Sequence, residues 1–436
     1  MSMTNSIKTI ASSIASKLME HEDIFANSDH DKNQLYSFNS YPSIIIYLCY
    51  YYQISNDETS IEYIELYCNK LLASLVEKGS IGSSLSYGII GVAYSIEEIN
   101  KCEPKEKMLK SINKLVIKLT EMGLNEANAN LMNSNIHEYD FDIIQGLSSN
   151  LNYLCHSSQA SSYTELINKI VSYMVKLLEN ESNLIIYPKN MINESLKSEY
   201  PHGYVNLSLS HGIAGVLLSL NSALESNVSL YDRKIVISTI QNYLKLYYVI
   251  MKKSEIENTN IEGFFGLEGR ISKENFEKRI YLYNTERQSW CYGSLGMMRA
   301  LYKCALTIKS SFYQSVFLEK LIELSSLSVD DLNLESATFC HGYSGALMIN
   351  HLMYKDSGKI IFEDTSNKLA HKIISLGDSN YKYFFYNYDN FFDGKIFEAK
   401  KNIRDLSIIS GSCGVMLSLL SYSRLIDSRW ANIFMI

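Results

Sequence analysis

Apolar residues recur along this chain at the spacing of one face of an α-helix, in many successive segments. The first series comprises Ile7, Ile10, Ile14 and Leu18, which follow one another at intervals of three or four residues. Comparable series occupy 61–75, 109–119, 166–177 and 235–244, with Lys, Glu and Asn on the other face. This periodicity is typical of amphipathic, half-exposed helices. It predicts an all-α protein.

A second kind of segment alternates with these helices; it is poor in charge and begins with glycine. Each copy has a Gly-x-x-Gly pattern or a close variant, followed by an apolar run. The first glycines of six copies are Gly88, Gly146, Gly212, Gly293, Gly342 and Gly411, separated by 58, 66, 81, 49 and 69 residues. The segment 40–45 looks like a seventh copy without glycines, and Ser149 replaces the second glycine of the copy at Gly146. Each interval has room for a pair of helices with loops.

Internal repeats of this kind determine the architecture more strongly than any single residue. A charged amphipathic helix that alternates with a nearly uncharged one predicts an outer layer of helices around an inner layer. Seven such pairs would close into an α/α toroid of seven inner and seven outer helices, and an open solenoid is the alternative. We expect one domain over residues 1–436, with the residues one and two before each first glycine at one end of it. Two long intervals, at about 182–206 and 257–286, predict insertions of short strands or irregular loops, including an alternating segment at 279–283.

The composition excludes some classes of function. The chain has 436 residues, 46% of them apolar, which is enough for one large domain or for two or three ordinary ones. A net charge of −7 and the lack of a long basic run argue against a nucleic-acid partner. The longest strongly apolar stretch, 41–51, is too short to span a bilayer, and residues 1–20 do not resemble a secretory signal. We therefore expect a cytoplasmic protein whose 8 cysteines are reduced.

Two of these cysteines occupy the same position in consecutive copies of the repeat. Cys291 lies two residues before Gly293, and Cys340 lies two residues before Gly342 with His341 beside it. Two thiolates and an imidazole leave a fourth tetrahedral position open, as in a catalytic zinc site, and soft ligands select zinc over magnesium or calcium. We predict one Zn2+ per chain at these three residues. The alternative for any single cysteine is a small buried apolar residue, which we expect for Cys49, Cys155, Cys304 and Cys413.

Two titratable residues occupy related positions in earlier copies. His211 directly precedes Gly212, and Asp142 lies four residues before Gly146. Taken singly, each residue is as well explained by a structural role as by a catalytic one. Beside a metal ion, they become candidates for a general acid or base.

These motifs together resemble the lanthionine synthetase C-like (LanC-like) family, the lanthipeptide cyclases. The resemblance extends from about residue 41 to residue 420. Its motifs are Trp290-Cys291-Tyr292-Gly293, Cys340-His341-Gly342, Ser210-His211-Gly212, Asp142 with Gly146, and Arg287 four residues before the first cysteine. It implies a seven-fold double α-toroid with a central zinc ion, and a stand-alone cyclase of class I systems.

The resemblance also implies a reaction, in which a cysteine of a precursor peptide adds to dehydroalanine or dehydrobutyrine to close a thioether ring. Zinc would convert the peptide thiol to a thiolate, because coordination lowers a thiol pKa of about 8.5. His211 would transfer the proton, and Asp142 would orient His211 or assist it. Arg287 and Tyr292 would hold the enolate oxygen or the substrate backbone.

The implied partners are a dehydrated precursor peptide, a dehydratase and an ABC transporter. Contact with the inner face of the membrane would then be peripheral and made through those partners. Two other functions are considered. A zinc-bearing scaffold of the same fold would bind a thiol or a peptide without closing a ring. A glycoside hydrolase with an α/α barrel would need a second carboxylate, and Asp142 has no acidic partner at an equivalent repeat position.

Overall fold

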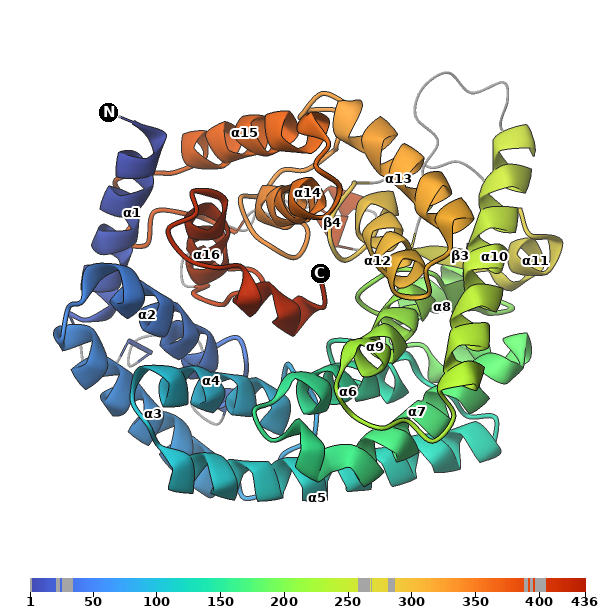
Figure 1. The fold of residues 1–436 in the computed structure, drawn as a ribbon, viewed down its shortest axis with the longest axis horizontal. Helices are drawn as coiled ribbons and strands as arrows, with labels where there is room; N and C mark the ends of the chain where they lie inside the picture. Colours follow the sequence, from blue (N-terminus) through green and yellow to red (C-terminus); the bar gives the residue numbers. More distant parts are fainter. Residues whose placement is uncertain are drawn as a thin grey trace. The chain divides into compact units, whose positions relative to one another are not determined.

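Helices make up nearly all of the regular structure in the described part of the chain (Figure 1). The structure, a computed structural model, describes residues 2–20, 24–25, 34–257, 267, 269–280, 287–387, 391–392, 395–396 and 405–436. These residues form two compact units, one of Met1–Leu119 with Leu334–Ile433 and the other of Thr120–Asn333 with Phe434–Ile436. The prediction of a single domain over 1–436 stays a prediction.

The first unit contains four buried helices and the helices that cover them. The buried helices are α2 (Tyr41–Ser55), α4 (Ile89–Cys102), α14 (Tyr343–Ser357) and α16 (Ser412–Tyr422). The covering helices are α1 (Met3–Leu18), α3 (Thr59–Lys78), α15 (Ile360–Ser375) and the first part of α5 (Glu106–Met132). The unit also contains η6 (Arg429–Phe434) and the paired strands β4 (Phe391–Phe392) and β5 (Lys395–Ile396). Among these buried helices, α14 contacts α16, α16 contacts α2, and α2 contacts α4.

The second unit repeats this arrangement. Its buried helices are α6 (Leu147–His156), α9 (Ile213–Glu225) and α12 (Ser294–Thr307), and α9 contacts both of the others. The covering helices are α7 (Thr164–Glu179), α10 (Arg233–Glu257), α13 (Ser311–Ser326) and the second part of α5 (Figure 1). Short elements complete it: η2 (Glu138–Asp140), η3 (Ala160–Tyr163), η4 (Glu181–Leu184), η5 (Pro188–Asn190), α8 (Glu194–Glu199) and α11 (Lys273–Lys278).

The apolar spacing of the sequence identifies the buried face of the covering helices in most cases. In α1, Ile7, Ile10, Ile14 and Leu18 are all buried, as predicted. A few members of the other series are only half-buried, and Ile235 in α10 faces solvent: it is 46% exposed, while its neighbour Val236 is buried. Val236 lies four residues before Ile240 and so shares its face, whereas Ile235 is turned about 100° away, toward solvent.

Each predicted inner helix begins at the residue directly after the first glycine of its motif. This holds for α4, α6, α9, α12, α14 and α16, and α2 begins in the same way after Ser40. Consistent with an inner position, every residue of α9 from Ile213 to Leu224 is buried. The second glycine allows the preceding loop to fold onto the helix: a Cβ at Gly296 would lie 2.1 Å from the carbonyl oxygen of Trp290. No side chain larger than hydrogen can occupy such a position without moving the backbone.

Hydrogen bonds between backbones connect neighbouring motifs within each unit, just before the glycines. Four bonds follow the pattern: Phe38 N to Ser86 O (2.8 Å), Ile143 N to Ser210 O (3.0 Å), Ser210 N to Cys291 O (3.3 Å) and Cys340 N to Ile409 O (2.8 Å). Ser210 takes part in two of these bonds, so seven positions are involved. Six of them lie two residues before the residue that caps the buried helix of their motif, and Ile143 lies three before it. Within each unit, the residues before the glycines therefore lie side by side, as the repeat register predicted.

The long intervals contain the predicted short strands. Strand β2 (Tyr204–Asn206) pairs in antiparallel fashion with β1 (Ile185–Ile186) on one side and β3 (Arg270–Ser272) on the other. The register places Asn206 opposite Arg270. Most of the alternating segment at 279–283 lies outside the described residues, and Arg279 is the C-cap that follows α11.

Candidate active site

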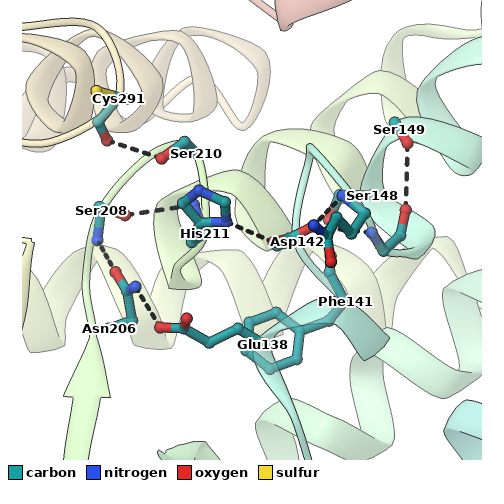
Figure 2. Close-up of polar contacts among 12 residues, drawn as sticks. Glu138, Phe141, Asp142, Ser148, Ser149, Asn206, Ser208, Ser210, His211 and Cys291 are labelled. Carbon is teal, nitrogen blue, oxygen red and sulfur yellow. Dashed lines mark hydrogen bonds and ion pairs between the residues drawn. The ribbon is translucent and has the colours of Figure 1, made fainter. Parts of the chain in front are cut away.

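A histidine–aspartate pair connects two motifs of the second unit. The Nδ1 atom of His211 lies 2.5 Å from Oδ2 of Asp142 (Figure 2). His211 occupies the turn before α9, and Asp142 the loop between η2 and α6. Only 2% of Asp142 is exposed, so its carboxylate is held away from water. The structure thus brings together two residues that the sequence identified independently.

Asp142 is fixed by the loop in which it lies. Its Oδ1 atom accepts hydrogen bonds from the backbone N–H groups of Gln145 (2.6 Å) and Gly146 (2.8 Å). Its own N–H donates to the carbonyl of Glu138 at 2.9 Å. Because one carboxylate oxygen is engaged by the turn before α6, the other is directed at His211. The first glycine is required here, since a Cβ at Gly146 would lie 2.3 Å from the backbone nitrogen of Asp142.

The surroundings of His211 favour its protonated form. Burial by itself lowers the pKa of an imidazole, but the adjacent Asp142 carboxylate outweighs this effect, and the pKa of His211 lies above its ordinary value. The Glu138 carboxylate also raises the pKa of His211, and the Arg270 guanidinium lowers it. The pair can therefore hold a proton near neutral pH. Since Nδ1 is engaged by Asp142, Nε2 is the nitrogen available to a substrate.

Cys291 is bound directly to the segment that carries His211. The backbone N–H and the hydroxyl of Ser210 both donate to the carbonyl oxygen of Cys291, each at 3.3 Å (Figure 2). The Cys291 thiol lies 3.4 Å from the hydroxyl oxygen of Ser289. Gly293, which caps α12, has φ +97°, and a Cβ there would lie 2.3 Å from the carbonyl oxygen of Arg287. This left-handed conformation, which favours glycine, sets the turn that presents Cys291.

Cys340 and His341 lie in the first unit, in the turn before α14. Both side chains are half-buried, and the N–H of Cys340 is held by the carbonyl of Ile409. A Cβ at Gly342 would lie 2.2 Å from the carbonyl oxygen of Ser336, so this turn also needs glycine. With Cys291 of the second unit, Cys340 and His341 make up a ligand group of two thiols and one imidazole, which are ligand types compatible with a metal ion.

Tyr292 lies beside His211; each of the two directly precedes the first glycine of its motif. The ring centroids of Tyr292 and His211 are 5.9 Å apart. Its hydroxyl accepts a hydrogen bond from Nη2 of Arg270 at 2.6 Å. Burial raises the pKa of Tyr292 well above its ordinary value, and the Arg270 guanidinium opposes that rise. Tyr292 is therefore a neutral hydrogen-bond donor at physiological pH.

Sequence reasoning identified Arg287 but missed the arginine that contacts Tyr292. Arg287 is half-buried, and its carbonyl lies against Gly293. Arg270 lies in β3, inside an interval that the sequence marked only as an insertion. Glu138, which pairs with it, lies in a polar loop where the sequence does not distinguish a buried carboxylate from a solvated one. The only signal in the sequence was that each residue precedes a predicted site residue within its own interval between motifs: Glu138 precedes Asp142, and Arg270 precedes Arg287.

Comparisons with known proteins give the family and the fold. A family model described as "Lanthionine synthetase C-like protein" matches residues 31–435. The chain is 28% identical over 313 residues to the "Nisin biosynthesis protein NisC" of Lactococcus lactis subsp. lactis, which is 71% of each chain. Among solved structures, a nisin cyclase matches with a TM-score of 0.76 and 22% identity, over 99% of this chain and 97% of that one. This likeness shows the fold and confirms the predicted class, an all-α toroid.

Proposed function

The chain belongs to the lanthionine synthetase C-like family, and from that premise we propose that it is a zinc-dependent lanthipeptide cyclase. Its substrate is a precursor peptide that contains cysteine and dehydroalanine or dehydrobutyrine. The observation that carries the proposal is the hydrogen bonding of Ser210 to the Cys291 carbonyl, which places the His211–Asp142 pair beside a cysteine of the ligand group.

We propose that Cys291, Cys340 and His341 hold one zinc ion. The ligand types support this assignment, because two thiolates and an imidazole are soft donors that leave one tetrahedral position open. When bound, zinc lowers the pKa of a thiol that coordinates it and so supplies a thiolate nucleophile near neutral pH.

The remaining chemistry needs a proton at a carbon atom. Attack of the peptide sulfur on the β-carbon forms the S–C bond, and the π electrons of the dehydro residue move toward its carbonyl to give an enolate. A proton must then reach the α-carbon, and the proton lost by the thiol balances it, so the reaction is an addition without an oxidant. His211 is the group that donates this proton, since Asp142 keeps its imidazole protonated and oriented.

The enolate oxygen needs a hydrogen-bond donor while it carries negative charge. Tyr292 is a neutral phenol next to His211, and its hydroxyl serves this purpose. Arg287 acts as a second donor, a cationic one, toward the oxygen or the peptide backbone. Donors of this kind stabilise charge that develops in the transition state more than they stabilise the ground state.

Partners and location follow from the substrate. Dehydro residues react with cellular thiols, so the peptide should pass directly from a dehydratase to this chain. We propose a complex with a dehydratase and an ABC transporter at the cytoplasmic face of the membrane. None of the described helices is both long enough and apolar enough to cross a bilayer, which fits contact with the membrane through partners.

The test is ring closure by the purified chain on a dehydrated precursor peptide. Ring closure leaves the peptide mass unchanged, but each ring removes one thiol that can be alkylated. We expect mass spectrometry after alkylation to show fewer labelled cysteines with the zinc-loaded protein than with buffer or with chelated protein. If the protein binds both zinc and the peptide but leaves every thiol free, it is a binding scaffold.

A further inference from the structure

A largely buried ionic network contacts Tyr292, and the proposed reaction assigns it no role. It consists of Glu138 from η2, Arg270 from β3 and Asn206 from β2, beside the tyrosine ring. Only 3% of Glu138 is exposed. Burying a carboxylate and a guanidinium is costly unless each is paired and hydrogen-bonded. We therefore considered what the network does for Tyr292.

Arg270 holds Tyr292 by two kinds of contact. Its Nη2 atom donates to the hydroxyl oxygen of Tyr292 at 2.6 Å. Its guanidinium also lies over two aromatic faces, 4.9 Å from the ring centroid of Tyr292 and 5.3 Å from that of Tyr204. A stacked guanidinium that also donates a hydrogen bond fixes both the plane of the tyrosine ring and the direction of its hydroxyl.

Glu138 forms an ion pair with Arg270. The Nε atom of Arg270 lies 3.9 Å from Oε1 of Glu138, which accepts a hydrogen bond from the side-chain amide of Asn206 at 2.5 Å. The amide oxygen of Asn206 accepts from the N–H of Ser208 at 3.0 Å, and the Ser208 hydroxyl accepts from the N–H of His211 at 3.3 Å (Figure 2). The network thus connects Arg270 to the loop that carries His211.

The backbone of Gly269, the residue before Arg270, also contacts Tyr292. A Cβ at Gly269 would lie 1.9 Å from a ring carbon of Tyr292, so the ring packs directly on the strand backbone. The carbonyl of Gly269 accepts from the N–H of Leu207 at 2.6 Å, which anchors β3 beside β2. Tyr292 is therefore confined by the Gly269 backbone as well as by the Arg270 side chain.

The hydrogen-bond chemistry of Arg270 has a consequence for Tyr292. A guanidinium has five N–H donors and no acceptor, so the tyrosine oxygen must accept from it. The hydroxyl proton of Tyr292 is then directed toward a different acceptor. A neutral phenol fixed in this way is a preorganised donor, and preorganised donors contribute most where negative charge develops.

We propose that Arg270, paired with Glu138, is a positioning residue that holds the Tyr292 hydroxyl as a donor to the carbonyl oxygen of the dehydro residue. The inference rests on the proposed cyclase function. Arg270 does not touch the substrate; it acts through Tyr292. Its removal should therefore affect the rate of ring closure through Tyr292 and leave peptide binding unchanged.

The test compares Arg270→Gln, Arg270→Lys and Glu138→Gln with a matched control, Arg279→Gln. Arg279 is also paired with a glutamate, Glu181, and stacked 4.7 Å from a ring centroid, that of Phe276. Its side chain is 23% exposed, against 24% for Arg270. Arg279 therefore resembles Arg270 in burial and in its kinds of contact, but its contacts are with Glu181 and Phe276 and not with Tyr292.

We expect Arg270→Gln to lower kcat by about 10-fold to 100-fold with KM unchanged, because misplacing a catalytic group has effects of this size. Arg270→Lys should have a higher kcat than Arg270→Gln. The kcat of Glu138→Gln should lie between those of the two Arg270 variants, and that of Arg279→Gln should match the wild type. In a Tyr292→Phe background, Arg270→Gln should have no further effect, because the hydroxyl on which it acts is gone. An equal loss in both backgrounds, or none in either, would overturn the proposal.

A second measurement does not depend on turnover. With 3-fluorotyrosine at position 292, the fluorine resonance should shift or broaden in Arg270→Gln and Glu138→Gln, and stay unchanged in Arg279→Gln. An unchanged resonance in Arg270→Gln would also overturn the proposal, whether or not the protein closes rings. If the wild-type protein closes no rings, the proposed function fails by itself, and the resonance still decides whether Arg270 positions Tyr292.

Discussion

His211 and Asp142, which are 69 residues apart in the sequence, share a hydrogen bond of 2.5 Å between Nδ1 and Oδ2. The aspartate is held by two backbone N–H groups at the start of α6, and the histidine directly precedes α9. The loops that precede two neighbouring buried helices therefore each contribute one member of the pair. The bond engages Nδ1, so Nε2 is the ring nitrogen left to exchange a proton with the substrate.

Replacing His211 by alanine should abolish most ring closure and leave zinc bound. A general acid or base contributes about 10²-fold to 10⁴-fold to a rate, so we expect a loss in that range. The measurement is the number of alkylated cysteines on a dehydrated precursor over time, with metal content determined on the same sample. A His211→Ala protein that closes rings at the wild-type rate would remove His211 from the mechanism, and one that has lost its zinc would make it a ligand.

The pH dependence of kcat should report the protonation of His211. Its pKa lies above the ordinary value, because the Asp142 carboxylate outweighs the effect of burial. As a proton donor, His211 is active below that pKa, so kcat should fall as the pH rises through it. Asp142→Asn removes the carboxylate and leaves burial, which lowers the pKa, so the descending limb should move to lower pH. A limb that stays in place in Asp142→Asn would show that another group controls it.

Zinc binding should depend on both cysteines of the ligand group. We expect Cys291→Ala and Cys340→Ala each to reduce the zinc content of the purified protein from about one ion per chain toward zero, because a site with three protein ligands is greatly weakened by losing one. Metal analysis by mass spectrometry measures this directly. Cys304→Ala is the control: Cys304 is fully buried in α12 and outside the ligand group, so its zinc content should equal that of the wild type. Full occupancy in either Cys291→Ala or Cys340→Ala would contradict the assignment.

Gly269→Ala should disturb Tyr292 through contact alone. The new Cβ would lie 1.9 Å from the tyrosine ring, so the ring or the strand must move. We expect destabilisation of about 1–3 kcal/mol, as for other overpacked sites, together with a lower kcat. Gly82→Ala is the matched control, because a Cβ at Gly82 meets nothing within 4 Å. Denaturant unfolding and the alkylation assay measure the two effects, and wild-type behaviour of Gly269→Ala would show that the ring is not confined by this strand.

The repeat register was sufficient to place most of the site. The glycine motifs predicted where six buried helices begin, and the residues before each glycine were expected to lie together. The backbone hydrogen bond from Ser210 to Cys291 agrees with that expectation within the second unit. Such a register can be read from the sequence because each glycine meets a backbone atom of its own loop, as Gly296 meets the Trp290 carbonyl six residues earlier. The contact is made within one loop, so it requires a glycine at a fixed position in the sequence.

The tertiary structure alone decided which charged groups meet around Tyr292. Arg270 reaches the tyrosine because β3 pairs with β2, and Glu138 reaches Arg270 because η2 lies close to both. Neither residue belongs to one of the glycine motifs, so the repeat register does not mark it. The apolar pattern likewise identified the covering helices but not their exact rotation, as Ile235 shows. Periodicity and close backbone contacts are properties of neighbouring residues, whereas a buried ion pair depends on partners brought together from distant parts of the chain.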